Sequence, residues 1–416
     1  MSKWLHKLPK KLNNAPKAPK KVKEKQPKAA GKIEDLDRYR QSLKLRKWIS
    51  LILAGCTIVI LVIVLATAFF TGKFTEFFYH FKQLSAEDQY PVTIKEQSFS
   101  DAEGMDRYLS IMTRNGVIFL DEKGEKADEA VLGYSSPVMK NNQEAVMIYD
   151  HSGNQFCYAK PFEQGFTIET EKKIITGAIS KEGNCAIATY HDRYAAEVTV
   201  YHTDGSVSYR WYSASDKVIS LAFDDESNRL YVCCINASGG FLKTIVYALN
   251  LNSEKEIYRT TLSNSVSPYY MQPMSDGGLA VVTTGSIEFL DKDGATLSAT
   301  YYYSDLYAVD GSGKYLALAQ KNINNNTTSL LIYNASGDRI ASTELNDVPY
   351  DMHLTGTKLY CLTDDNFFHW SFSKNENELI DLEEHCSGMA ILGETVFLYS
   401  NNTVSRMETA QNTSKK

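Results

Sequence analysis

Apolar and polar residues alternate along most of this chain, in short runs separated by polar turns. One phrase recurs, in which two alternating apolar strands surround a tight turn that contains Gly or Asn. It occurs as GVIFLDEKGEKADEA (116–130), VTVYHTDGSVSYRW (198–211), SIEFLDKDGATLSAT (286–300) and LLIYNASGDRIASTE (330–344). Alternation with a period of two around such turns predicts β-hairpins.

The phrase returns about every 41 residues, the repeat length of a four-stranded β-propeller blade. In register, the repeats form units at 97–131, 132–172, 173–213, 214–264, 265–304, 305–345, 346–383 and 384–410. A two-sheet sandwich would not repeat one phrase at a fixed interval, and a parallel β-helix needs a far shorter repeat. We therefore predict an all-β fold, a β-propeller with eight blades, or with seven if one unit is misread.

The last unit, at 384–410, offers only three strands before the polar end of the chain. A strand without a blade, Tyr90–Ile94, precedes the first complete unit. If this strand completes the last blade, the ring closes and leaves no open sheet edge. The expected propeller domain spans residues 90–410, and a polar tail follows at 411–416.

A single apolar stretch, from Trp48 to Phe70, has no ionisable side chain other than Cys56. As a helix it is about 34 Å long, which is enough to cross the hydrocarbon core of a bilayer. The region ahead of it is much longer than that of a cleaved signal peptide. We predict a signal-anchor transmembrane helix at 48–71 that contacts the lipid bilayer from Trp48 to Phe70.

The overall net charge of −6 conceals a strong asymmetry. Residues 1–47 hold 16 Lys and Arg against 4 Asp and Glu, whereas residues 72–416 have a net charge of −18. Because positive flanks stay in the cytoplasm, we expect a single-pass cell-membrane protein with a cytoplasmic N-terminus and an extracellular C-terminal domain. The Lys-rich tail is predicted to be disordered and to attract anionic lipid headgroups. It lacks the aromatic and Arg pattern of nucleic-acid binding, so no nucleic-acid partner is expected.

Residues 72–89 form a juxtamembrane aromatic linker in this interpretation. Its apolar residues follow the spacing of one helix face, at intervals of four and three: Phe70, Phe74, Phe77, Phe81 and Leu84. Such a stripe is typical of a collar at the membrane surface or of a seam that pairs with another helix.

Signals for catalysis or metal binding are weak. Asp291–Gly294 and His202–Gly205 resemble the start of calcium loops, but neither continues with the further ligands and the closing Glu. Ser371 and Lys374 have the spacing of a Ser/Lys acylase without its companion motifs. We predict no catalytic residue, no cofactor and no metal site. His353 and His385 occupy similar places in consecutive units, so they are candidates to face a central channel.

Seven Cys are too few for a disulfide scaffold in a chain of this length. Those beyond the membrane segment lie mostly on predicted strands and are expected to be free: Cys157, Cys185, Cys233, Cys234, Cys361 and Cys386. The adjacent pair Cys233 and Cys234 must point to opposite faces of its strand.

One aromatic cluster is a candidate protein-binding surface. It consists of Tyr301, Tyr302, Tyr303 and Tyr307, with Tyr269 and Tyr270 one blade earlier. Tyr is enriched in protein interfaces, although alternate members of the cluster are expected to fill the core between blades. Because an acidic domain is repelled by an anionic envelope surface, a useful contact has to be short-range and specific in shape.

The strand Tyr90–Ile94, the hairpin at 116–130 and the stretches GYSSPVMK (133–140) and AVMIYDHSGNQFCY (145–158) resemble a bacterial family. Its members occur mainly in Gram-positive anaerobes, and their function is unknown. The resemblance implies a basic tail, one membrane helix and propeller-like repeats, and it supplies no catalytic residues. We predict a non-enzymatic protein-binding or scaffold module of the cell envelope. The alternatives are a ligand sensor coupled to the cytoplasmic tail and a propeller hydrolase or oxidoreductase.

Overall fold

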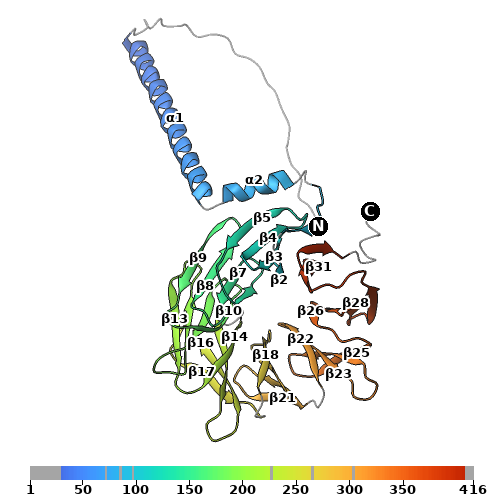
Figure 1. Ribbon diagram of the computed structural model, residues 1–416. Coiled ribbons are helices and arrows are strands. Elements are labelled where there is room, and N and C mark those ends of the chain that lie inside the picture. The colour runs from blue at the N-terminus through green and yellow to red at the C-terminus, as the bar shows by residue number, and fades with distance from the viewer. Residues whose placement is uncertain are drawn as a thin grey trace, which may run out of the picture. The chain divides into compact units, whose positions relative to one another are not determined.

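The computed structural model describes residues 30–70, 73–83, 87–95, 98–224, 228–263, 267–301 and 305–407. Two helices come first, α1 (Ala30–Phe70) and α2 (Lys73–Gln83), and every later element described is a strand (Figure 1). Helix α1 is long and apolar enough to cross a membrane between Leu43 and Val64. Of the tail predicted to be disordered, residues 1–29 lie outside the described residues, whereas residues 30–47 are helical and form the first part of α1.

The strands pair into eight antiparallel sheets of four strands, and each sheet is one blade of a ring (Figure 1). Blade 1 contains β2 (Phe99–Gly104), β3 (Tyr108–Thr113), β4 (Gly116–Asp121) and β5 (Lys126–Val131), and blade 2 contains β6 (Pro137–Asn141), β7 (Val146–Asp150), β8 (Gln155–Lys160) and β9 (Glu163–Glu169). Blade 3 contains β10 (Ile174–Ile179), β11 (Cys185–Thr189), β12 (Ala196–Tyr201) and β13 (Val207–Ser213), and blade 4 contains β14 (Lys217–Asp224), β15 (Arg229–Asn236), β16 (Lys243–Asn250) and β17 (Glu256–Thr261). Blade 5 contains β18 (Pro268–Pro273), β19 (Leu279–Thr283), β20 (Ser286–Leu290) and β21 (Thr296–Tyr301), and blade 6 contains β22 (Leu306–Ser312), β23 (Tyr315–Lys321), β24 (Thr328–Asn334) and β25 (Arg339–Leu345). Blade 7 contains β26 (Asp351–Thr355), β27 (Lys358–Leu362), β28 (Asn366–Ser371) and β29 (Glu376–Asp381), and blade 8 contains β30 (Gly388–Leu392), β31 (Thr395–Ser400), β32 (Thr403–Arg406) and β1 (Val92–Thr93). The prediction of an eight-bladed propeller is therefore confirmed.

The ring closes through the strand that comes first in the chain. Strand β1 pairs with β32, with Val92 opposite Val404, and so completes the last blade. Arg406 on β32 holds the segment ahead of β1, because its guanidinium pairs with Asp88 at 2.5 Å and lies over the ring of Tyr90 at 5.1 Å. The last blade is thus built from both ends of the repeat region.

The core lies between the blades, where eight clusters of buried side chains each join two neighbouring blades. Middle strands such as β3 and β4 are buried along their whole length, since both faces of a blade are covered. Cys233 packs into the cluster toward blade 5, and Cys234 packs into the cluster toward blade 3. This confirms that the two thiols point to opposite faces, and both are free and buried.

The Asp-Gly sequences that resemble calcium loops are hairpin turns. The Asp291 carboxylate accepts the backbone N–H groups of Asp293 at 2.9 Å and Ala295 at 2.8 Å, and Gly294 takes a φ of +83°. The equivalent turn at 202–205 ends on Gly205, with a φ of +81°. An Asp that caps its own turn and a Gly in the left-handed region explain the recurring phrase without a metal.

Each innermost strand runs in the same sense, so the ring has two distinct faces. We call the face where β2, β6, β10, β14, β18, β22, β26 and β30 begin the amino face, and the face where they end the carboxyl face. In five blades the pairing of the innermost strand shifts near its first residues, as at Pro268/Tyr270 and Leu306/Ala308. Such a β-bulge leaves one residue outside the ladder at the amino face.

Candidate functional site

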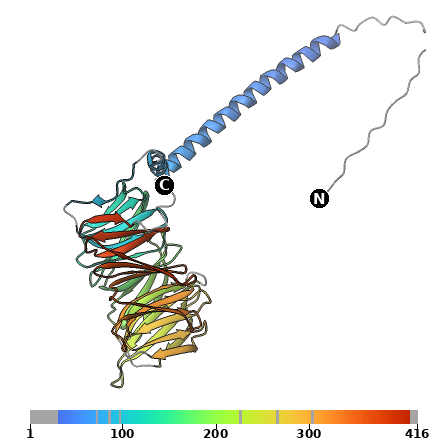
Figure 2. The ribbon, with the colours of Figure 1, turned by 90° about the vertical axis from the view of Figure 1, so that its right-hand side faces the viewer.

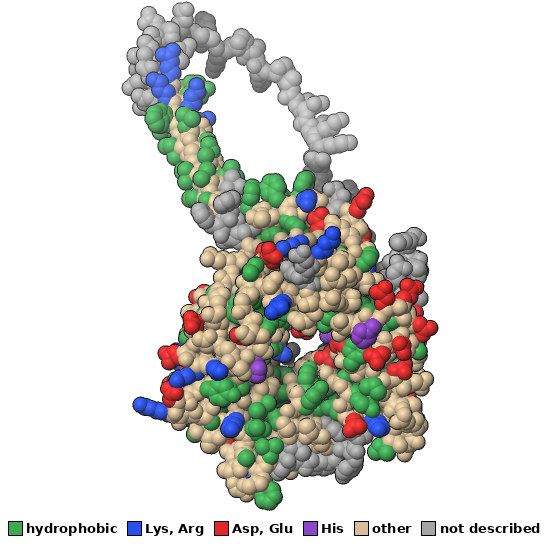
Figure 3. All heavy atoms as spheres, viewed as in Figure 1, with side chains coloured by type: hydrophobic (Ala, Val, Ile, Leu, Met, Phe, Trp, Pro, Cys, Tyr) green, Lys and Arg blue, Asp and Glu red, His purple; other side chains and the backbone are tan. Residues whose placement is uncertain are grey.

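The innermost strands surround a central channel, and the space-filling view shows the ring hollowed at its centre (Figure 3). A set of polar and charged side chains comes from five of these strands: Asp101 and Glu103 of β2, Lys140 of β6, Tyr270 and Gln272 of β18, Asp310 of β22, and Asp351 and His353 of β26. Four of them are carboxylates. Blades far apart in the sequence thus bring one set of charges together.

His353 is the cation that faces these carboxylates most directly. Its Nε2 lies 3.4 Å from Asp351 Oδ1, and its side chain is 24% exposed. Burial alone would lower the pKa of His353. The hydrogen bond to Asp351 and the fields of Asp351, Glu103 and Asp310 outweigh that effect and raise the pKa to about 9. His353 is therefore an imidazolium at neutral pH.

The carboxylates of the channel are harder to ionise than free carboxyl groups. Burial raises the pKa of Glu103 to about 7, although His353 opposes the change. Burial also raises the pKa of Asp101 and of Asp310. Because these buried groups lie close together, the protonation of one depends on the charge of the others.

Two of these carboxylates also join neighbouring blades. Asp310 Oδ2 accepts the backbone N–H of Leu354 at 2.6 Å, and Asp351 Oδ2 accepts that of Met389 at 2.8 Å. Each bond links one innermost strand to the innermost strand of the next blade. Part of the charge in the channel is thus structural, since it holds the inner ring together.

The channel opens at the carboxyl face into a cavity of about 470 Å³. Backbone and amide groups at the ends of the innermost strands line it, including Gly104, Asn141 and Gln272. Within the described residues no group of three His, Cys, Asp or Glu side chains is arranged to hold a metal ion. The channel and this cavity together can accept a small polar or cationic molecule.

The two histidines singled out from the sequence lie in different surroundings. His353 belongs to the channel, whereas His385 lies in the loop before β30 with 66% of its side chain exposed. The ring of His385 is 5.9 Å from that of Tyr350, and Asp364 is 3.9 Å away. The hypothesis of a shared channel site therefore holds for His353 alone.

The tyrosines predicted to bind a partner are divided by the bulges at the amino face. Tyr269, at the bulge of β18, is 58% exposed, and Tyr307, at the bulge of β22, packs partly against the core between blades 6 and 7. Tyr270 packs against the core between blades 5 and 6, as expected for alternate members of the cluster, and its hydroxyl donates to Gln272 Oε1 at 2.9 Å. Tyr302 and Tyr303 lie outside the described residues. Tyr301 ends β21, and only its backbone is described.

A second aromatic cluster on the amino face was missed in the sequence. Tyr194 and Tyr212 are 44% and 39% exposed, and their ring centroids lie 5.0 Å apart. The ring of His191 lies 5.1 Å from that of Tyr194 and 5.5 Å from that of Tyr212. We call these three residues the blade 3 cluster. The only available signal was the run Tyr190-His191 after a strand end, since Tyr212 comes from a different hairpin.

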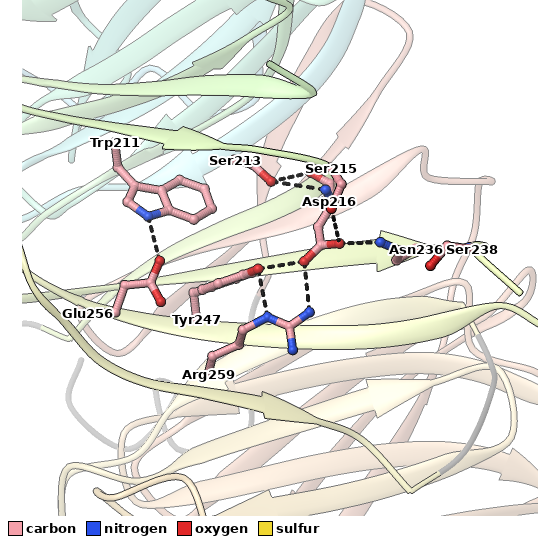
Figure 4. Close-up of polar contacts among 9 residues, drawn as sticks. All are labelled: Trp211, Ser213, Ser215, Asp216, Asn236, Ser238, Tyr247, Glu256 and Arg259. Atoms are coloured by element: carbon pink, nitrogen blue, oxygen red, sulfur yellow. Dashed lines mark hydrogen bonds and ion pairs between the residues drawn. The ribbon is translucent and has the colours of Figure 1, made fainter. Parts of the chain in front are cut away.

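A polar network centred on Asp216 begins at Ser213, the residue that follows Tyr212 (Figure 4). The carboxylate of Asp216, whose side chain is 2% exposed, accepts the Tyr247 hydroxyl at 2.5 Å and Arg259 at 3.1 Å. Asn236 also donates to Asp216, and the Ser213 hydroxyl donates to the backbone carbonyl of Asp216 at 2.6 Å. The network ties the end of β13, which carries Tyr212, to blade 4.

Comparison with solved structures returns other propellers at low sequence identity. The WD40 domain of SCAP from fission yeast matches with a TM-score of 0.52 and 8% identity, over 76% of this chain and 96% of that chain. BamB from Moraxella catarrhalis matches with a TM-score of 0.48 and 11% identity, over 77% of this chain and 98% of that chain. At 8% identity the likeness to the WD40 domain shows the fold alone and carries no function. A search of the curated proteins found no match.

The family comparison covers nearly all of the ring. The match runs over residues 79–409, from within α2 to just beyond β32. It agrees with the resemblance to a family of unknown function seen in the stretches at 90–94, 116–130, 133–140 and 145–158, while the Gram-positive source and the membrane anchor stay predictions. By this match the chain belongs to DUF5711, a family of unknown function.

Proposed function

We propose that this protein is a membrane-anchored, extracytoplasmic binding module that holds a protein partner of the cell envelope on the amino face of its propeller, without catalysis. The observation that carries the proposal is the blade 3 cluster, in which exposed aromatic rings stand on a rigid blade. Large aromatic side chains that lose little rotamer entropy are typical anchors of protein interfaces.

One residue of the tyrosine surface predicted from the sequence, Tyr269, supports a binding site on the same face. Tyr269 is 58% exposed at the bulge of β18, and it lies at the amino face, as the blade 3 cluster does. A partner that spans blades 3 to 5 would contact both groups. Because residues 72–416 are strongly acidic, long-range attraction would favour a basic partner, while the rings supply the short-range fit.

The test is photocrosslinking of the full-length protein in the membranes of its own cells. A p-benzoylphenylalanine in place of Tyr190, which is 55% exposed beside the cluster, should give one defined protein adduct. The double change Tyr194→Ser and Tyr212→Ser should then lower the adduct yield by at least about tenfold while the melting temperature stays the same.

The matched control is Leu297→Ser, because Leu297 is 50% exposed on the outermost strand of blade 5 and away from the amino face. It should leave the adduct unchanged. Equal yields from the tyrosine double variant and the unaltered chain would refute a partner on this face. A lowered melting temperature would instead mean that the rings serve the fold.

A further inference from the structure

Helix α2 has two opposite faces, and the contacts with the propeller among the described residues come from one of them. With about 100° between successive residues, Glu76, Tyr79 and Gln83 share one side of the helix. Four aromatic residues share the other side: Phe74, Phe77, Phe78 and Phe81. We call this second side the phenylalanine face.

The contacting side is held by specific polar bonds to the turn between β4 and β5. The Tyr79 hydroxyl donates to Asp121 Oδ2 at 2.5 Å, and Lys123 Nζ donates to the backbone carbonyl of Gln83 at 2.7 Å. Lys82 pairs with Glu125 at 3.5 Å. The ring of Tyr79 also lies 5.1 Å from that of Phe162 of blade 2. The helix is therefore fastened to blades 1 and 2.

Three of the four rings on the phenylalanine face are mostly exposed to solvent. Phe77, Phe78 and Phe81 are 64%, 54% and 66% exposed. The rings of Phe77 and Phe78 lie 5.9 Å apart. Three neighbouring aromatic rings left largely in water would be costly, so this face needs an apolar surrounding.

The chain itself indicates which surrounding that is. Helix α1, with its apolar stretch at Leu43–Val64, ends at Phe70, and α2 begins at Lys73. An amphipathic helix this close to the end of a membrane-crossing helix starts at the level of the lipid headgroups. We propose that the phenylalanine face is buried at the headgroup–acyl boundary of the bilayer that α1 crosses, and that α2 thereby holds the edge of blades 1 and 2 against the membrane.

This arrangement would leave both loop faces of the ring accessible. Figures 1 and 2 show α2 at the outer edge of the ring beside blade 1, and not across the amino face. A bilayer against the phenylalanine face therefore meets the edge of the ring. The proposal depends on the membrane anchor of the proposed function, and it is independent of any protein partner.

The test uses the full-length chain in vesicles of phosphatidylethanolamine and phosphatidylglycerol. A p-benzoylphenylalanine replaces Phe77 or Phe81, and the products are identified by mass spectrometry after illumination. Lipid adducts are expected at both positions. Leu297, exposed on blade 5, is the negative control and should give no lipid adduct. Ile60, within the apolar stretch of α1, is the positive control and should give a high yield of lipid adduct.

A variant series checks that the face acts as a unit. With the photoreactive residue at Phe78, the changes Phe77→Ser and Phe81→Ser should lower the lipid adduct by about tenfold, because the buried apolar area sets the strength of interfacial binding. The melting temperature of the propeller should not change, since both side chains point away from it.

Each remaining outcome counts against the proposal. A covalent dimer from Phe77 or Phe81 would show that a second copy covers the face, in a helix-pairing seam. Yields at Phe77 and Phe81 no higher than at Leu297 would show that the face meets no lipid although α1 is anchored. Loss of adducts at Ile60 as well would overturn the anchor itself, and with it this proposal.

Discussion

Gly240 and Gly294 share a backbone conformation but differ in what surrounds them. Their φ angles are +84° and +83°, a region that side chains with a Cβ rarely adopt. A Cβ at Gly294 would lie 2.6 Å from both Thr260 Oγ1 and Tyr258 Cδ2, whereas a Cβ at Gly240 would have no atom within 4 Å. The turn that contains Gly294 is packed against the neighbouring blade, and the turn that contains Gly240 is open.

We therefore expect Gly240→Ala to lower the free energy of unfolding by about 1 kcal/mol, from backbone strain alone. Gly294→Ala adds an overlap with Tyr258, so its cost should reach about 2–4 kcal/mol. Urea denaturation of the propeller measures both. Equal losses would mean that the neighbouring blade yields freely to the added methyl group.

The pH dependence of the channel has two parts of distinct origin. His353 has a pKa raised to about 9, so its stabilising effect is complete below the unfolded value near 6.5 and is lost as the pH rises through 9. Glu103 is an acid with its pKa raised to about 7, so ionising it costs stability as the pH rises from about 4 to 7.

These signs lead to a direct prediction. The melting temperature should fall between about pH 6.5 and 9, and His353→Gln should flatten that part of the profile. Glu103→Gln should flatten the part between about pH 4 and 7 and leave the alkaline part in place. If both variants kept the full profile, other groups would control the titration.

Among the structural elements, blades 3 and 4 are joined by a charge that water does not reach. Hydrogen bonds from Tyr247, Asn236 and Arg259 outweigh burial and lower the pKa of Asp216 (Figure 4). Since the folded pKa is depressed, this contribution is present above about pH 4 and is lost as the pH falls through the folded value.

Asp216→Ala should cost about 2–3 kcal/mol, because it leaves the buried Tyr247 hydroxyl and the partly exposed donors of Asn236 and Arg259 without this acceptor. Glu256→Gln is the matched control, since Glu256 only accepts the Trp211 indole N–H, at 3.0 Å, and a Gln oxygen can still accept it. Its cost should stay below about 1 kcal/mol. Thermal unfolding of both variants separates the two cases, and a mild Asp216→Ala would contradict a structural role for the network.

Closure of the ring depends on a strand of only two residues and on the side chains around it. Tyr90, Val92 and Ile94 pack against the cluster between blades 8 and 1, and the rings of Tyr90 and Phe397 lie 4.9 Å apart. These contacts come from a segment that precedes all the repeats in the chain.

A propeller that begins at residue 98 should therefore melt lower than one that begins at residue 87, by on the order of 10 °C, or should aggregate through the exposed edge of β32. The two proteins are compared by calorimetry and light scattering. Equal melting temperatures would show that the last blade is stable with three strands.

At the scale of the whole molecule, the topology stays a prediction that follows from charge. The 16 basic side chains of residues 1–47 favour the cytoplasm, and the propeller would then lie outside. Protease added to intact spheroplasts should digest or release the propeller and leave the N-terminal tail protected. Protection of the propeller would reverse the orientation.

The repeat alone determined the architecture. Alternation, turn residues and a period near 41 residues are local properties, so eight units and the closing strand ahead of them could be read before any contact was known. The apolar segment between the basic tail and the acidic remainder was equally visible, because a membrane-crossing helix is recognised by length and composition.

Only the tertiary structure decided which titratable side chains lie close together. Asp101, Glu103, Asp310 and His353 meet in the channel because their strands share the inside of the ring, although up to 252 positions separate them in the sequence. Alternation predicts that Tyr269 and Tyr270 point to opposite sides, but only the packing of the blades decides that Tyr269 is the exposed one and that Tyr270 reaches Gln272. Convergence of distant strands and shifts of register depend on how the blades pack against one another, and no local pattern of residues records that.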